Sequence, residues 1–256
     1  MKVLKFGGTS VGTAVNIKSV KNIVFSQSED IIVVVSALGE ITDKILNAAK
    51  MAALGTGFYH EELEIIKQRH TEVIEALFED TSDVAGRVNE LLSELDQVLT
   101  GVTLVNELTP KTLDRLLGMG ERMSSIILSS FLGVALKNSA DFIITDSQFG
   151  KASVDFQETN RRLKDAFKGF SGVVVVAGFI SRNKSGEFTT LGRGGSDYTA
   201  AIIAAALDAR SLEIWTDVDG FMTADPRVIR KAYTIPVLSY TEAMELSNFG
   251  AKVIYP

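Results

Sequence analysis

Three glycines surround one arginine in the stretch TTLGRGGSDYTAA, residues 189–201, directly before an alanine-rich apolar run. Glycine has no side chain, so a ligand can approach its backbone closely. Arg193 lies between glycines, where it is poorly placed to cover apolar surface but well placed to clamp a carboxylate with its planar guanidinium. Ser196 or Asp197 can cap the helix that follows. The stretch therefore predicts an anion-binding loop, with an ordinary glycine turn as the alternative.

A second candidate site is KFGGTSVG, residues 5–12. Lys5 stands at the end of an apolar strand pattern, and Gly7 and Gly8 expose backbone N–H groups before a helix expected to start near Val11. Such a turn can hold phosphate oxygens against a lysine charge and a helix N-terminus. A tight turn with a solvated lysine is an equal alternative, because the chain contains neither a Walker P-loop nor a Rossmann glycine pattern.

The stretch SALGEITDK, residues 36–44, also connects a strand pattern to a helix pattern. Its hydroxyl residues, Ser36 and Thr42, could hydrogen-bond a small polar ligand. Hydroxyl side chains at such a position more often cap the helix, and the residues alone favour that interpretation.

The stretch WTDVDGFMTADPRV, residues 215–228, is rich in aspartate. It does not fit a calcium loop, because the first ligand position of that pattern falls on Trp215 and only Asp217 and Asp219 precede Gly220. A loop that holds a base or a ribose is the better interpretation.

These stretches follow strands of one predicted sheet. Short, nearly continuous apolar runs alternate with helical patterns, which is typical of an α/β protein with a parallel sheet covered on both faces. Ligands of such sheets bind beyond the carboxyl ends of the strands, where the four stretches lie. The predicted strands are KVLKF (2–6), DIIVVVSA (30–37), DFIIT (141–145), GVVVVAGF (172–179) and SLEIWT (211–216), with a hairpin over 178–191.

A long helical insertion, at about residues 58–133, interrupts this alternation. Apolar residues recur at helical spacing in two stripes, over 63–77 and 84–99, and Pro110 opens a third helix. Both histidines belong to the insertion. His70 lies on an apolar stripe and His60 near a helix start, so we expect structural roles for them and no histidine base.

Composition limits the class of protein. The 256 residues include 26 basic and 32 acidic side chains, giving a formal net charge of −6, which argues against a phosphate-backbone binder. Cysteine is absent, so disulfides and thiolate chemistry are excluded. No apolar run approaches the ~20 residues of a membrane helix, and MKVLKFGG lacks a signal-peptide core. We therefore expect a cytoplasmic protein with neither nucleic acid nor membrane as a partner.

Six stretches, in this order and at these distances, resemble the aspartate kinases of the amino-acid-kinase superfamily. The order looks most like the kinase domain of the monofunctional enzymes and of fusions with homoserine dehydrogenase. The resemblance covers essentially the whole chain and rests on KFGGTSV (5–11), SALGEITD (36–43), GERMS (120–124), TLGRGGSDYTA (190–200), WTDVDGFMTADPR (215–227) and FGAKVIYP (249–256).

The resemblance implies a three-layer α/β/α sandwich with a mainly parallel central sheet. It also implies transfer of the γ-phosphoryl group of ATP, with Mg²⁺, to the side-chain carboxylate of L-aspartate, and no protein-held metal site. The residues that match the family's catalytic positions are Lys5 and Asp197. Those that match its substrate-binding positions are Ser36, Thr42, Glu121 and Arg193, and its nucleotide-binding positions correspond to Lys5, Gly7, Gly8, Thr216, Asp217, Met222, Arg227 and Lys252.

Each implied role has a physical reason. Lys5 with its glycines can stabilise the moving phosphoryl group, and Lys252 can reach the ATP phosphates. Arg193 can clamp a substrate carboxylate and Glu121 can pair with the substrate ammonium, although the residues alone would place Glu121 on a solvated helix face. Asp197 would organise Lys5 rather than act as a base, because the substrate carboxylate is already ionised near neutral pH.

Two departures from the family pattern stand out. Met222 occupies a position where the family often carries a tyrosine near the nucleotide, which puts stacking there in doubt. Family members also continue past GAKVIYP into regulatory ACT modules, and some into a dehydrogenase. We therefore expect residues 1–256 to be a kinase domain truncated at its C-terminus, without those modules, from a full-length protein that forms a homo-oligomer.

Two other functions are considered. A kinase of the same superfamily could act on glutamate, carbamate or a nucleoside monophosphate, but the trio Thr42, Glu121 and Arg193 disfavours it. Alternatively, the chain could be a catalytically incompetent fragment that binds nucleotide, or a partner through its helical insertion.

Overall fold

The centre of the fold is a five-stranded, all-parallel sheet in the computed structural model, which describes residues 1–55, 57–225, 228–250 and 253. The strand order is β3-β5-β2-β1-β8. The inner strands are buried almost throughout, which explains their continuous apolar sequences. The strands of this sheet are β1 (Lys2–Phe6), β2 (Ile31–Val35), β3 (Ala135–Asn138), β5 (Val173–Ala177) and β8 (Ser211–Trp215).

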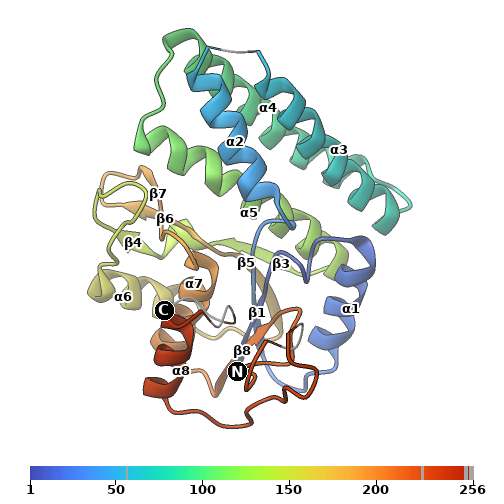
Figure 1. The fold of residues 1–256 in the computed structure, drawn as a ribbon, viewed down its shortest axis with the longest axis vertical. Coiled ribbons are helices and arrows are strands. Elements are labelled where there is room, and N and C mark those ends of the chain that lie inside the picture. The colour runs from blue at the N-terminus through green and yellow to red at the C-terminus, as the bar shows by residue number, and fades with distance from the viewer. Residues whose placement is uncertain (56, 226–227, 251–252, 254–256) are drawn as a thin grey trace.

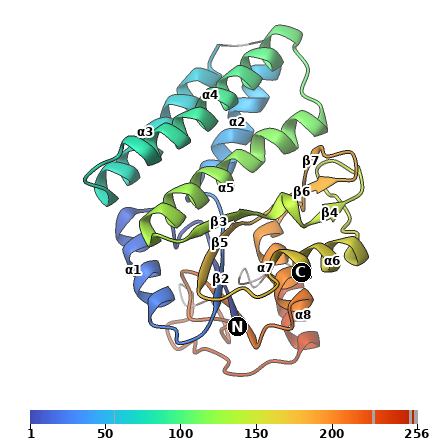
Figure 2. The same cartoon turned by 180° about the vertical axis from the view of Figure 1, so that it is seen from behind.

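Helices cover both faces of this sheet and complete the three expected layers (Figures 1 and 2). Alternate residues of β2 point to opposite faces: Val33 and Val35 join one hydrophobic core with the helices α1 to α5, and Val34 joins the other with α6 and α7. The helices are α1 (Ala14–Phe25), α2 (Ile41–Ala53), α3 (Tyr59–Leu77), α4 (Ser82–Val105), α5 (Pro110–Leu132), α6 (Phe156–Ala166), α7 (Gly195–Ala206) and α8 (Tyr240–Asn248).

The expected helical insertion is confirmed as α3, α4 and α5, which stack with α2 over one face of the sheet (Figure 1). Pro110 is the first residue of α5, after the cap Thr109, whose side chain accepts a hydrogen bond from the backbone N–H of Thr112. His70 is fully buried, and its Nδ1 lies 2.7 Å from the carbonyl oxygen of Ile66. Burial lowers the pKa of His70 to about 4, so a structural histidine is confirmed. His60 is exposed in the first turn of α3.

The hairpin predicted over 178–191 is present, but it belongs to a second sheet of three strands. Its strands are antiparallel, and β4 pairs with the first of them in parallel. The run 141–145 was therefore wrongly placed in the central sheet, whose edge is instead the short, half-buried strand β3. The second sheet consists of β4 (Ile144–Thr145), β6 (Ile180–Asn183) and β7 (Phe188–Thr190).

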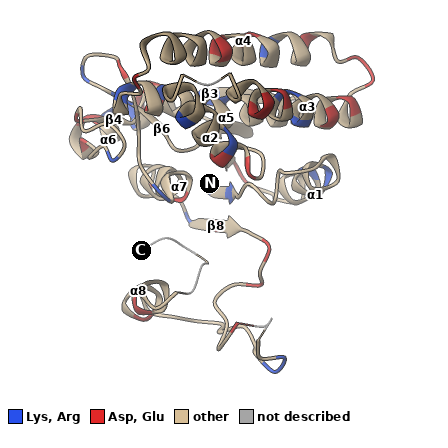
Figure 3. Ribbon diagram, turned by 45° about the horizontal axis from the view of Figure 1, so that its top comes forward, with Lys and Arg blue, Asp and Glu red and all other residues tan. Residues whose placement is uncertain are grey.

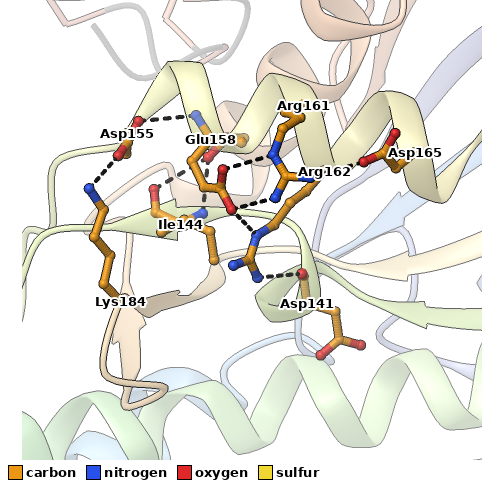
Figure 4. Close-up of polar contacts among 9 residues, drawn as sticks. Asp141, Ile144, Asp155, Glu158, Arg161, Arg162, Asp165 and Lys184 are labelled. Carbon is orange, nitrogen blue, oxygen red and sulfur yellow. Dashed lines mark hydrogen bonds and ion pairs between the residues drawn. The ribbon is translucent and has the colours of Figure 1, made fainter.

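A network of charged side chains fixes α6 to the second sheet (Figure 4). Glu158 accepts hydrogen bonds of 2.7–3.0 Å from Arg161 and Arg162, which together lower the pKa of its carboxyl to about 2. Asp155 caps the helix and forms an ion pair of 2.9 Å with Lys184 of the hairpin. The alternation of strands and helices predicted a helix between 145 and 172 but not its bounds, because only Thr159 and Leu163 of α6 are buried and no apolar stripe marks it.

The described residues after β8 stand apart from the three layers (Figure 3). Those before α8 form no helix and no strand, and α8 begins with a capping box between Ser239 and Glu242. Large apolar side chains in this part are exposed, among them Tyr240 and Phe249. Within the described residues, no helix has the length and apolar character needed to cross a bilayer.

Candidate active site

Lys5 and Asp197 form the centre of the candidate site at the carboxyl end of β1. The Nζ of Lys5 lies 2.7 Å from Oδ1 of Asp197, in an ion pair whose side chains are largely buried. Asp197 belongs to the first turn of α7, where a negative charge is also favoured by the helix dipole. The two residues expected to be catalytic are therefore brought together by a strand end and a helix start.

Gly7 and Gly8 leave open backbone beside this pair. A Cβ atom on Gly7 would lie 3.5 Å from Nζ of Lys5, and one on Gly8 would lie 3.0 Å from the carbonyl oxygen of Ala37. A side chain at Gly8 would crowd the neighbouring loop, and one at Gly7 would lie in van der Waals contact with the ammonium group. The turn ends at α1, whose side-chain cap is Thr13, so the helix starts three residues later than expected.

Glu121 is buried beside Lys5, and this disagrees with the solvated position that its sequence alone suggested. Only 4% of the residue is exposed, and Oε2 has no hydrogen-bond partner among the described residues. Burial raises the pKa of its carboxyl to about 7, although a hydrogen bond with the backbone of Ala37 and the charge of Lys5 pull in the opposite direction. A buried carboxylate with a free oxygen is suited to receive a cationic group from a ligand.

The loop after β2 packs on the same helix as Glu121. Ser124 of α5 donates a hydrogen bond of 2.7 Å to the carbonyl oxygen of Ser36. The capping interpretation of Ser36 and Thr42 is wrong: the cap of α2 is Glu40, with no side-chain cap hydrogen bond, and Thr42 lies inside the first turn. Both residues are half-buried. Their hydroxyls are thus not used to cap the helix.

The glycine-rich stretch owes part of its composition to backbone shape. Gly192 and Gly194 have φ angles of 74° and 71°, in the left-handed region that favours glycine. Gly194 is the cap of α7 and has no side-chain partner, so the expectation that Ser196 or Asp197 caps this helix is wrong. Arg193 is exposed and has neither a hydrogen bond nor an ion pair with any described residue. Its guanidinium is available to a ligand.

The residues expected to bind nucleotide follow β8, next to β1 in the sheet. Thr216 is half-buried and donates a hydrogen bond of 3.0 Å to the exposed side chain of Asp217. Met222 is half-buried in an isolated antiparallel bridge to Thr234. A cavity of about 250 Å³ opens beside Thr216, between α1 and the end of β8. Arg227 and Lys252 lie outside the described residues.

The acidic residues of the site do not form a metal-binding cluster. The described part of the chain contains no group of three or more histidine, aspartate or glutamate residues that could hold an ion.

The sequence analysis missed Asp114, a carboxylate on α5 that is only 1% exposed. Asp114, Gly118, Glu121 and Ser125 recur at intervals of three or four residues and so share one helix face. This spacing of small and acidic residues on one face of the helix is the signal that could have identified it.

Sequence comparison relates the whole chain to known kinases. Residues 1–256 match the amino acid kinase family. The chain is 35% identical to aspartokinase 1, chloroplastic, of Arabidopsis thaliana over 268 residues, covering 99% of this chain and 46% of that protein. It is 32% identical to the bifunctional aspartokinase/homoserine dehydrogenase of Buchnera aphidicola, covering all of this chain and 33% of that protein. The chain thus spans less than half the length of these relatives.

Solved structures agree with this relationship. Aspartokinase III of E. coli in complex with aspartate and ADP (R-state) superposes with a TM-score of 0.90 at 32% identity, covering all of this chain and 58% of that one. The aspartate kinase of Clostridium acetobutylicum superposes with a TM-score of 0.81 at 30% identity, covering all of this chain and 56% of that one. By its match over the full length and its parallel sheet with a site at the strand ends, the chain belongs to the amino acid kinase family.

Proposed function

We propose that this chain transfers the γ-phosphoryl group of Mg²⁺-bound ATP to the side-chain carboxylate of L-aspartate, forming 4-phospho-L-aspartate and ADP. The observation that carries the proposal is the buried Glu121, whose free oxygen lies near the Lys5–Asp197 pair. A buried carboxylate oxygen that has no hydrogen-bond partner costs free energy unless a cation of a ligand satisfies it. The relatives and solved structures described above support aspartate as the ligand, since one of those structures holds aspartate and ADP.

Aspartate carries one ammonium and two carboxylates, which need one anion and at least one cation in the site. Glu121 pairs with the ammonium, because it is buried within the range of the Lys5 charge and its Oε2 has no hydrogen-bond partner among the described residues. The exposed guanidinium of Arg193 clamps a carboxylate through two parallel hydrogen bonds. The hydroxyls of Ser36 and Thr42, which cap no helix, complete the hydrogen bonds around the substrate.

The reaction needs charge neutralisation and alignment more than covalent help. An oxygen of the ionised acceptor carboxylate attacks the γ-phosphorus, a new P–O bond forms, and the bond to the β,γ-bridging oxygen breaks as ADP leaves. No proton has to be removed from the acceptor near neutral pH. Lys5 donates to the oxygens of the moving phosphoryl group, and the backbone at Gly7 and Gly8 allows them to approach. Asp197 holds the Lys5 ammonium in place.

The nucleotide is bound on the β8 side of Lys5. Thr216 and Asp217 follow β8, which pairs directly with β1, so the phosphates of a nucleotide bound there can reach Lys5. Met222, Arg227 and Lys252 are proposed nucleotide-binding residues on the strength of the sequence resemblance. Magnesium enters with the phosphates as part of the substrate.

A panel of acceptors tests this function. ADP release should be followed by a coupled assay with aspartate, glutamate, carbamate and a nucleoside monophosphate, and ³¹P NMR should detect the acyl phosphate. We expect release that depends on aspartate, with the acyl phosphate as product. Release with another acceptor instead would overturn the choice of substrate. Calorimetric titration with a non-hydrolysable ATP analogue and aspartate measures binding alone. Binding of both ligands in the titration, without ADP release in the assay, would identify a fragment that binds but does not catalyse.

A further inference from the structure

The buried carboxylate of Asp114 accepts hydrogen bonds from three donors, two at the end of β7, where the Arg193 loop begins, and one in the loop after β4. Its Oδ2 accepts hydrogen bonds from the backbone N–H groups of Gly150, at 2.8 Å, and Thr190, at 3.1 Å. Its Oδ1 accepts a hydrogen bond of 2.7 Å from the hydroxyl of Thr190. One side chain of α5 therefore fixes the end of β7 and the loop after β4 to the helical layer.

A purely structural contact at this position would not require a carboxylate, because burial of the Asp114 charge costs free energy. It forms no ion pair with any described lysine or arginine, so its charge is balanced only by hydrogen bonds. Burial raises the pKa of its carboxyl despite the three bonds, which shows that the environment disfavours the charge. An apolar side chain could pack α5 against the hairpin with a smaller desolvation penalty. It could not accept hydrogen bonds from the two backbone N–H groups.

The two loops that Asp114 binds meet at the residue before Arg193. A Cβ atom on Gly192 would lie 3.4 Å from the carbonyl oxygen of Gly150, so the loops are in contact there. Thr190 precedes Arg193 by three residues. Asp114 thus holds the Arg193 loop from both sides, directly through Thr190 and indirectly through Gly150.

Asp114 and Glu121 stand on the same helix. They are seven residues apart, which places them on one face at a separation of about 10 Å along the axis. The helix is rigid over this distance, because its face is buried against the sheet and the loop after β2. The position of the Arg193 loop is therefore defined relative to Glu121 through a single element.

We propose that Asp114 is a positioning residue for the acceptor: it sets the position of the Arg193 loop relative to Glu121 and thereby the affinity for a substrate with both ammonium and carboxylate groups. This inference rests on the proposed function. Asp114 touches neither substrate nor nucleotide. Its removal therefore weakens acceptor binding more than it slows the chemical step.

Two substitutions of Asp114 and one control variant test the inference. Asp114→Ala removes all three hydrogen bonds. Asp114→Asn keeps the shape, and its amide oxygen can still accept from the two backbone N–H groups while Thr190 reverses its hydroxyl bond. Leu116→Ala is the matched control, because Leu116 is fully buried on the same helix, in the core that α5 shares with α1 to α4, and its truncation destabilises the protein without removing a hydrogen bond of Asp114.

We expect Asp114→Ala to raise KM for aspartate by at least about tenfold, with kcat and KM for ATP within about threefold of the wild type. Asp114→Asn should restore KM for aspartate to within about threefold, and Leu116→Ala should leave it unchanged at a comparable loss of thermal stability. An unchanged KM for aspartate in Asp114→Ala overturns the inference. An equal rise in Leu116→Ala overturns it as well, because the effect would then follow from general destabilisation.

Hydrogen exchange of the ligand-free protein gives a readout that does not depend on the reaction. The backbone amides of residues 149–151 and 190–194 should exchange faster in Asp114→Ala than in the wild type or in Leu116→Ala. Unchanged exchange in these segments shows that Asp114 does not hold the loops. If the wild type phosphorylates no aspartate, the proposed function fails together with the claim about affinity, while the exchange data still decide whether Asp114 fixes the Arg193 loop.

Discussion

The Lys5 ammonium interacts electrostatically with two carboxylates, those of Asp197 and Glu121, which have different structural roles. Asp197 lies 2.7 Å from Nζ of Lys5 and orients it, whereas Glu121 lies further away and keeps a free oxygen. A lysine that only balanced Asp197 would contribute little, because the cost of burying the charges offsets most of their attraction. Its position beside the open backbone of Gly7 is better explained by a third anion, the phosphoryl group in transfer.

Replacement of Lys5 by methionine tests this explanation. We expect Lys5→Met to lower kcat by at least ~10²-fold, which corresponds to roughly 2.7 kcal/mol of lost transition-state stabilisation. The matched control is Lys2→Met on the same strand, because Lys2 bonds Gln27 and Glu213 away from the site. That variant should keep kcat within about threefold. Wild-type turnover in Lys5→Met, measured by steady-state kinetics, would remove Lys5 from the mechanism.

The raised pKa of Glu121 predicts a pH-dependent affinity for aspartate. Only the ionised carboxylate pairs with the substrate ammonium, and the pKa of about 7 means that about one tenth of the ligand-free sites are ionised at pH 6. We expect KM for aspartate to rise by roughly tenfold between pH 8 and pH 6, with KM for ATP much less affected. Steady-state kinetics across this range provide the measurement. In Glu121→Gln, KM for aspartate should be high and independent of pH.

The same pKa predicts that Glu121 lowers the stability of the ligand-free protein at high pH. The pKa is raised above its usual value of 4.5, so ionisation in the folded state costs stability above pH 7, and this cost disappears as the pH falls toward 4.5. Glu121→Gln should therefore have a higher Tm than the wild type at pH 8, and the two should converge near pH 5. Calorimetric scans at both pH values provide the comparison. A lower Tm for Glu121→Gln at pH 8 contradicts this account.

At the scale of elements, the site depends on how closely α5 approaches the loop after β2. A Cβ atom on Gly120 would lie 2.9 Å from Cβ of Ala37, closer than side chains normally come. This contact places Glu121 beside the backbone of Ala37 and allows Ser124 to reach Ser36. The glycine before Glu121 therefore positions the carboxylate through packing rather than through backbone flexibility.

A pair of reciprocal substitutions tests this packing. Alanine favours a helix over glycine by about 1 kcal/mol, but crowding of a packed contact costs about 1–3 kcal/mol, so we expect Gly120→Ala to be destabilising. Ala37→Gly removes the opposing Cβ atom. The double variant Gly120→Ala/Ala37→Gly should therefore be more stable than the sum of the two single effects predicts, by about 1 kcal/mol in urea unfolding. If the stability effects of the two single substitutions are additive in the double variant, alanine at position 120 does not strain the contact with Ala37.

Elements that are buried on both sides could be predicted from the sequence, and elements at the edges could not. The runs at 31–35 and 173–177 are apolar throughout because helices cover both faces of the sheet. The edge strand over 135–138 is short and half-buried, so its sequence gives no comparable signal. The strand over 144–145 has an apolar sequence but belongs to the other sheet, because its partner is the hairpin. Sheet membership depends on contacts between distant segments, which periodicity does not encode.

The same distinction applies to the site. Lys5 lies near the end of β1, Gly7 follows β1 and Thr216 follows β8, so their place at one edge of the sheet could be predicted from the parallel arrangement. The burial of Glu121 and the hydrogen bonds of Asp114 depend on where α5 packs. The residues alone predicted a solvated helix surface at Glu121. Only the resemblance to a known family singled out Glu121, and nothing singled out Asp114.

At the scale of the whole molecule, the order of strands separates the residues proposed to bind the two ligands. The proposed nucleotide-binding residues follow β8 at one edge of the central sheet, Lys5 lies near the end of the neighbouring β1, and the loop after β2 lies on the far side of Lys5. Glu121 and Arg193 reach that side from the helical layer and from the loop before α7. The proposed function therefore predicts that aspartate and nucleotide approach Lys5 from opposite directions.

Because the site draws on all three layers, both ligands should stabilise the whole fold against heat. A ligand present at about 100 times its Kd stabilises the folded state by about 2.7 kcal/mol, which raises the Tm of a protein of this size by roughly 5–10 °C. We expect such a rise in calorimetric scans with aspartate alone and with a magnesium-bound, non-hydrolysable ATP analogue alone. Glu121→Gln should lose the rise with aspartate and keep the rise with the nucleotide, because it removes only the partner of the substrate ammonium. Glu75→Gln, on the exposed surface of α3, should keep both. If Glu121→Gln keeps the full rise with aspartate, Glu121 does not bind the acceptor and the division of the site along the sheet is wrong.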